Sequence, residues 1–108
     1  MMQIPRSALT KIMSFEAPDP DAEYGGEFLA PRTIEFVRFE RKEALNPKAY
    51  ALADGAQGRI WIDAVNSKGA CEVPKGSKVV IGETRMQAVS CTPFEAMGRI
   101  HHWEVDVK

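Results

Sequence analysis

The last segment of the chain, residues 101–107, alternates apolar and polar side chains with a period of two. The apolar positions share one face: Trp103, Val105 and Val107. The polar positions share the other: His102, Glu104 and Asp106. Because successive side chains of a β-strand point to opposite faces, this pattern predicts a strand with a buried face and a solvent or interface face. Residues 59–65 alternate in the same way and predict a second strand.

Residues 33–41 are rich in β-branched and aromatic side chains, which favours a long strand. Ile34 and Phe36 fall on one face, whereas Val37 and Phe39 fall on the other. A strand that changes its buried face midway often does so at a β-bulge. The sequence therefore predicts a bend or bulge near Phe36.

Shorter strands are predicted on either side of these segments. Residues 8–17 favour a strand, and residues 78–82 and 84–91 favour a hairpin that turns at Gly82. The stretches 18–27 and 42–58 contain Pro, Gly and Asp and lack sustained alternation, which predicts irregular loops.

Five to six strands with long irregular loops predict an all-β fold, a small and partly open β-barrel, with a two-sheet sandwich as the alternative. We expect a single β-barrel domain, residues 1–108, and the pattern leaves open whether the part up to about residue 32 is ordered or flexible. The predicted core comprises Ile34, Phe36, Ile60, Ile62, Val79, Val89, Trp103, Val105 and Val107.

Composition adds few constraints. The chain has 108 residues, 44% of them hydrophobic, and a formal net charge of -1, so no broad basic field favours nucleic acid. It has no apolar run long enough to span a bilayer and no secretory signal, so we expect no membrane contact and a reducing cytoplasm. Two cysteines are too few for a disulfide framework.

Metal binding and nucleophilic catalysis would have to use His101, His102, Glu104, Cys71 or Cys91. Adjacent histidines of a strand point to opposite faces, so they do not easily share one ion. The cysteines form no CxxC pair, and no local motif joins either thiol to a histidine. We therefore predict no catalytic residue, no metal and no cofactor, and a protein that is not an enzyme.

Asp63 stands among apolar residues, so its carboxylate needs donors if it is buried. Asn66 and Ser67 follow it closely and, with their backbone amides, can supply them. We interpret residues 63–67, "DAVNS", as a polar turn that ends a strand and fixes local geometry.

Residues 37–42, "VRFERK", place Arg38 and Arg41 beside Phe39, an arrangement that binders of single-stranded nucleic acid use. Glu35, Glu40 and Glu43 offset this charge, and cross-strand ion pairs on an exposed face explain the pattern better. A small β-barrel module that binds single-stranded nucleic acid or peptide is therefore an alternative function.

Four segments in order resemble one known family: "VRFER" (37–41), "IWIDAVNSK" (60–68), "KGSKVVIGETRMQAVS" (75–90) and "HHWEVDV" (101–107). This succession, from about residue 33 onward, is similar to the minor capsid protein family of tailed bacteriophages and prophages. The resemblance implies a structural virion protein, a head–tail connector or head-closure subunit. Such subunits assemble as rings on the portal and its adaptor.

The resemblance also implies partners and a location. The partners are portal or adaptor proteins, tail-side connector proteins and further copies in a ring, with DNA only as the content of the channel. The protein is expected in the host bacterial cytoplasm during assembly and then at the head–tail junction of the virion. Loop residues expected to make assembly contacts are Asp19, Asp21, Glu23, Tyr24, Lys42, Leu45, Lys48 and Tyr50.

Overall fold

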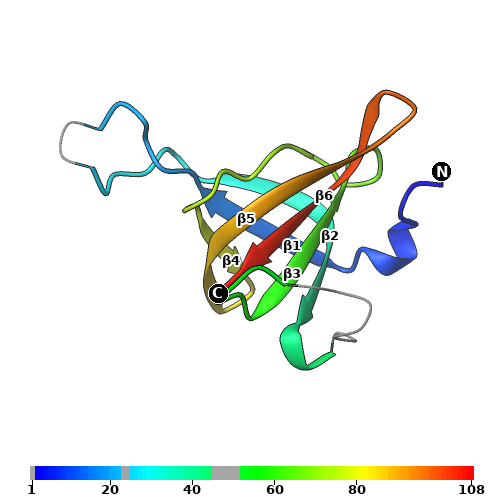
Figure 1. The fold of residues 1–108 in the computed structure, drawn as a ribbon, viewed down its shortest axis with the longest axis horizontal. Coiled ribbons are helices and arrows are strands. Elements are labelled where there is room, and N and C mark those ends of the chain that lie inside the picture. Colours follow the sequence, from blue (N-terminus) through cyan, green and yellow to red (C-terminus); the bar gives the residue numbers. More distant parts are fainter. Residues whose placement is uncertain (1, 23–24, 45–51) are drawn as a thin grey trace.

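Six antiparallel strands form a closed β-barrel in the computed structural model of the chain (Figure 1). The structure describes residues 2–22, 25–44 and 52–108. The strands are β1 (Lys11–Glu16), β2 (Arg32–Arg41), β3 (Gly58–Asp63), β4 (Lys78–Ile81), β5 (Thr84–Ala96) and β6 (Arg99–Val107). Two short 3-10 helices, η1 (Arg6–Ala8) and η2 (Lys42–Ala44), precede β1 and follow β2.

The strand order around the barrel is β1-β2-β3-β6-β5-β4, and β4 pairs with β1 to close it. The all-β prediction is confirmed. The predicted small β-barrel is also confirmed, and it is closed rather than partly open. Closure depends on β1, which pairs with β2 on one side and with β4 on the other, so each of the six strands has a neighbour on both sides.

A β-bulge at Phe36 changes which side chains of β2 face the core. Lys11 pairs with Val37 and Ile12 pairs with Glu35, so Phe36 has no partner on β1, and its φ is +61°. The extra residue allows Ile34 and Val37, which a regular strand would point to opposite faces, to be fully buried together. The predicted bulge is confirmed, whereas the assignment of Phe36 to the core is wrong because the bulge turns its side chain toward the barrel end, under Arg6.

A second β-bulge, in β5, shows that the assignment of Val89 to the core is wrong. Ala88 pairs with Val107 and Ser90 pairs with Asp106, which leaves Val89 as the extra residue of β5. Ala88 is buried in its place, and Val89 is only half-buried. Trp103 is also half-buried: it packs against the core cluster from the side, so its ring lies at the margin of the core.

The core fills the barrel with side chains from every strand. Of the predicted core residues, the following are buried: Ile34, Ile60, Ile62, Val79, Val105 and Val107. Further core positions are Met13, Phe15 and Ile81, together with Val73 from the connection between β3 and β4. Because β1 supplies two of these side chains and pairs with β2 and β4, this strand is an integral part of the barrel.

Two features project from opposite ends of the longest dimension, which is 43 Å (Figure 1). At one end lies the connection between β1 and β2, here called the arm and defined as residues 17–22 and 25–31. Its base is paired: Leu29 N donates to Ala17 O (2.8 Å) and Asp19 N donates to Glu27 O (2.9 Å). At the other end lies the tip of the β5–β6 hairpin, beside the N-terminal segment with η1.

Candidate functional site

The carboxylate of Asp63, at the end of β3, is fully buried and accepts several hydrogen bonds. Its Oδ2 accepts from Asn66 N (2.7 Å) and Val65 N (3.0 Å), and Ser67 Oγ accepts from Asp63 N (2.9 Å). The predicted polar turn at residues 63–67 is confirmed. The other carboxylate oxygen, Asp63 Oδ1, accepts from Ile4 N (2.8 Å). This contact spans 59 positions of the chain, so local sequence could not reveal it.

Asp63 therefore joins the N-terminal segment to the barrel. Asn66 Nδ2 donates to Ile4 O (2.8 Å), so the backbone of Ile4 is held on both sides. The side-chain amide of Gln3, turned so that its nitrogen faces the carboxylate, donates to Asp63 Oδ1 (2.9 Å). These contacts order the segment before η1 and give the buried charge the donors that it needs.

A chain of hydrogen bonds begins at the same N-terminal segment and runs along β6. His101 Nε2 contacts Met2 O (2.6 Å), His101 Nδ1 contacts His102 Nδ1 (2.7 Å), and His102 Nε2 contacts Glu104 Oε2 (2.9 Å). The two rings meet because His101 is an extra residue of β6: Phe94 pairs with His102, whereas Glu95 pairs with Ile100. The bulge brings together adjacent side chains that a regular strand would separate.

Arg59 of β3 extends this chain across the outer surface of the barrel. Its Nη1 lies 2.9 Å from Glu104 Oε1 and its Nε lies 2.6 Å from Asp106 Oδ1. Asp106 Oδ2 then accepts from Ala53 N (2.8 Å), in the segment that follows η2 and leads to β3. We call the set His101, His102, Glu104, Arg59 and Asp106 the polar ladder.

The polar ladder corrects one expectation about β6. Its polar face was expected to meet solvent or an interface, but the side chain of His102 is only 14% exposed and that of Asp106 only 6%. Phe94 stacks on His102, with ring centroids 4.8 Å apart, and the segment at Ala53 covers Asp106. Since each of these groups has an internal partner, the ladder holds structure together and presents no unpaired charge to a ligand.

Metal and thiol chemistry finds little support in the geometry. Within residues 2–22, 25–44 and 52–108, no group of three or more His, Cys, Asp or Glu side chains is arranged to hold a metal ion. Cys71 and Cys91 are both half-buried thiols. Burial raises the pKa of the Cys91 thiol and the charge of Glu72 adds to this, against a backbone hydrogen bond from Val73 that lowers it. A raised pKa disfavours the thiolate that a nucleophile requires.

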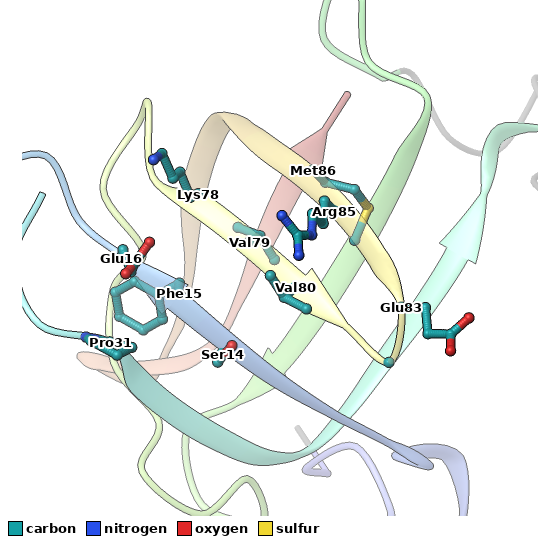
Figure 2. Close-up of a pocket in the computed structure, with 11 residues that line it drawn as sticks. Ser14, Phe15, Glu16, Pro31, Lys78, Val79, Val80, Glu83, Arg85 and Met86 are labelled. Carbon is teal, nitrogen blue, oxygen red and sulfur yellow. The ribbon is translucent and has the colours of Figure 1, made fainter. Parts of the chain in front are cut away.

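A groove of about 590 Å³ lies across β1, β4 and the start of β5 (Figure 2). Its apolar lining includes Pro31, Val80 and Met86. Lys78 and Arg85 reach it from β4 and β5, and Glu16 and Glu83 border it. The groove thus offers both apolar surface and charges of both signs, next to the base of the arm.

The residues expected to make assembly contacts are divided by the structure. Asp19 and Asp21 lie in the arm, where Asp21 N donates to Asp19 Oδ1 (2.9 Å). Lys42 begins η2 and its N donates to Gln57 O (2.7 Å). The others lie outside the described residues: Glu23, Tyr24, Leu45, Lys48 and Tyr50.

The basic and aromatic residues of β2 mostly contact one another. Arg38 lies over the ring of Trp61 (5.3 Å) and forms an ion pair with Glu40 (3.2 Å). Phe39 packs against the core, and Arg41 lies over its ring (5.4 Å). The stacking surfaces that single-stranded nucleic acid would use are therefore already covered by arginines of the same chain.

Comparisons with protein families, with curated proteins and with solved structures found no match to this chain. In the described part of the chain, no helix has the length and apolar character needed to cross a membrane.

Proposed function

We propose that this chain is a structural subunit of the head–tail junction of a tailed bacteriophage or prophage, a minor capsid or head-closure protein. It assembles as a ring on the portal–adaptor complex and contacts tail-side connector proteins. It uses no cofactor and performs no catalysis. The observation that carries the proposal is the ordered succession of four segments similar to the minor capsid protein family.

The positions of these segments in the fold support the proposal. They supply all or part of β2, β3, β4, β5 and β6, and thus most of the barrel. The polar residues of these segments make contacts within the barrel. Asp63, Asn66 and Ser67 form the buried turn, and the two histidines with Glu104 form most of the polar ladder. A shared set of residues that stabilises one barrel is what a family of structural subunits needs.

The two projecting ends also support assembly. A ring subunit needs one surface for each neighbour, and the arm and the hairpin tip lie at opposite ends of the molecule (Figure 1). The net charge of -1 suits a protein that lines a channel through which DNA must slide.

Sedimentation with portal-bearing, DNA-filled heads tests the proposal. We expect purified protein to sediment near monomer mass at low concentration, and to co-sediment with the heads and help them retain DNA. Protein that remains folded in the supernatant would contradict the proposal. Heads that lack the portal are the matched control, because the ring needs that platform.

The alternative, a module that binds single-stranded nucleic acid or peptide, is less well supported because Arg38 already has Glu40 and Trp61 as partners. Oligonucleotide binding that weakens steeply with salt would favour it. Absence of binding at low salt would exclude the nucleic-acid form of this alternative.

A further inference from the structure

Met97 occupies an unfavourable backbone conformation at the tip of the β5–β6 hairpin. Its φ is +54° and that of Gly98 is +77°, which are the signs of a two-residue type I′ turn. Asn-Gly is the favoured pair for this turn, since asparagine tolerates positive φ and methionine does not. The Met97 side chain is also 94% exposed, so neither the turn nor the core explains a large apolar residue at this position.

The surroundings of Met97 form an apolar surface with one unpaired cation. Val65 is 68% exposed and Ile100 is 37% exposed, and both line a hollow of about 410 Å³ with Met97. Arg99 lines the same hollow and forms no ion pair with another described residue. Glu95, on the facing strand of the same hairpin, is an acidic residue near it in sequence. Apolar surface collected at one exposed point is characteristic of a protein contact.

The opposite end of the molecule has the complementary features. The groove of about 590 Å³ is larger than a methionine side chain needs, and Pro31, Val80 and Met86 give it an apolar lining (Figure 2). The described part of the arm beside it carries three acids and no base: Asp19, Asp21 and Glu27. None of these carboxylates forms an ion pair with another described residue.

We propose that the hairpin tip of one copy docks on the arm end of a second copy, with Met97 in the groove and Arg99 facing the carboxylates of the arm. A second copy is the occupant that the charges favour, because Arg99 lies at one end and the acids of the arm and groove outnumber the bases there: Asp19, Asp21, Glu27, Glu16 and Glu83 against Lys78 and Arg85. Such a contact between different surfaces is heterologous, and it generates a ring when its rotation closes. The inference rests on the proposed function and names the surfaces that its ring would use.

Met97→Asn separates folding from association. The asparagine suits the type I′ turn, so we expect the urea midpoint of unfolding to stay constant or rise, while self-association weakens at least tenfold in sedimentation velocity. Ile12→Thr is the matched control: Ile12 is an apolar side chain of β1, 57% exposed, outside the lining of both hollows. Wild-type protein that remains monomeric at about 1 mM would overturn the proposal.

A charge exchange tests the direction of the contact. Arg99→Glu alone and Asp19→Arg/Asp21→Arg alone should each lose self-association, because like charges then face each other. An equimolar mixture of the two variants should regain association with the copies alternating, since the reversed tip complements the reversed arm and the unchanged tip complements the unchanged arm. A mixture that stays monomeric would show that these two surfaces do not meet.

The same variants distinguish this inference from the proposed function. If Met97→Asn protein joins heads in the wild-type copy number, the tip contact is wrong and the function stands. If wild-type protein associates through the tip but never joins heads, the contact is correct and the function is wrong.

Discussion

His101 Nδ1 lies 2.7 Å from His102 Nδ1, and the Nε2 atom of each ring faces an oxygen. Met2 O and the carboxylate of Glu104 are acceptors, so both Nε2 atoms carry hydrogen. The contact between the two Nδ1 atoms needs a hydrogen on one of them, because two lone pairs would otherwise face each other. One Nδ1 therefore donates to the other, and this hydrogen bond holds the two rings edge to face.

We expect nitrogen-detected NMR to show this proton. Both Nε2 atoms should report a bound hydrogen, and the two Nδ1 atoms should share one. His102→Ala is the control, since it removes the shared proton but leaves the contact between His101 and Met2. Spectra that show no hydrogen shared between the two Nδ1 atoms would contradict this assignment.

Replacing Asp63 should be strongly destabilising. In Asp63→Ala, the backbone N–H groups of Ile4, Val65 and Asn66 lose their acceptor in a buried turn, which we expect to cost about 3 kcal/mol in the free energy of unfolding. Asp54→Ala is the control, because Asp54 is an exposed loop carboxylate and should change stability by less than about 0.5 kcal/mol. Urea denaturation measures both, and equal midpoints for the two variants would refute the role of Asp63.

Alanine substitutions at two glycines should distinguish the cost of backbone strain from the cost of a steric clash. Gly82 and Gly69 both have positive φ, but a Cβ at Gly82 meets nothing within 4 Å, whereas one at Gly69 would lie 2.9 Å from Thr33 O. We expect Gly82→Ala to cost about 1 kcal/mol from strain alone, and Gly69→Ala about 2–3 kcal/mol because the neighbouring backbone must also move. Thermal or urea unfolding gives the order, and a less stable Gly82→Ala variant would reverse the argument.

The Cys91 thiol should react slowly with alkylating agents. Its pKa is raised, chiefly by burial, so at pH 8 a smaller fraction is thiolate than in an unperturbed cysteine. The rate should therefore be below that of a free thiol at pH 8, and should rise about tenfold per pH unit up to the raised pKa. A Cys71→Ser background leaves one thiol to follow by mass spectrometry. A rate that levels off below pH 8 would show that the thiolate forms too easily for this environment.

The strands could be predicted from the sequence because their alternation is a local property. The bulge at Phe36 was predictable for the same reason, since the change of buried face is visible within residues 33–41. The extra residue at Val89 was missed because Ala88 and Val89 are both apolar, so the stretch does not show which of them is buried; the irregularity appears in its pairing with β6. Closure of the barrel was missed because it depends on β1 meeting β4, more than 60 positions away.

In the candidate site, too, local contacts could be predicted from the sequence and long-range contacts could not. The turn at Asp63 was predictable because its donors are neighbours in sequence. The polar ladder was not, because Met2, Arg59 and Ala53 reach His101 and Asp106 only through the fold. The exposure of Met97 also required the structure, although a methionine before glycine in a hairpin turn was a signal that could have been noticed.

The strand order has a consequence for synthesis of the chain. β6 is the last of the six strands to be translated, yet it lies between β3 and β5, and β1 must wait for β4 before its second edge is paired. The barrel therefore cannot close on the ribosome until β6 has emerged. A nascent chain arrested before residue 99 should expose the edges of β3 and β5, which makes such intermediates natural clients of chaperones and proteases.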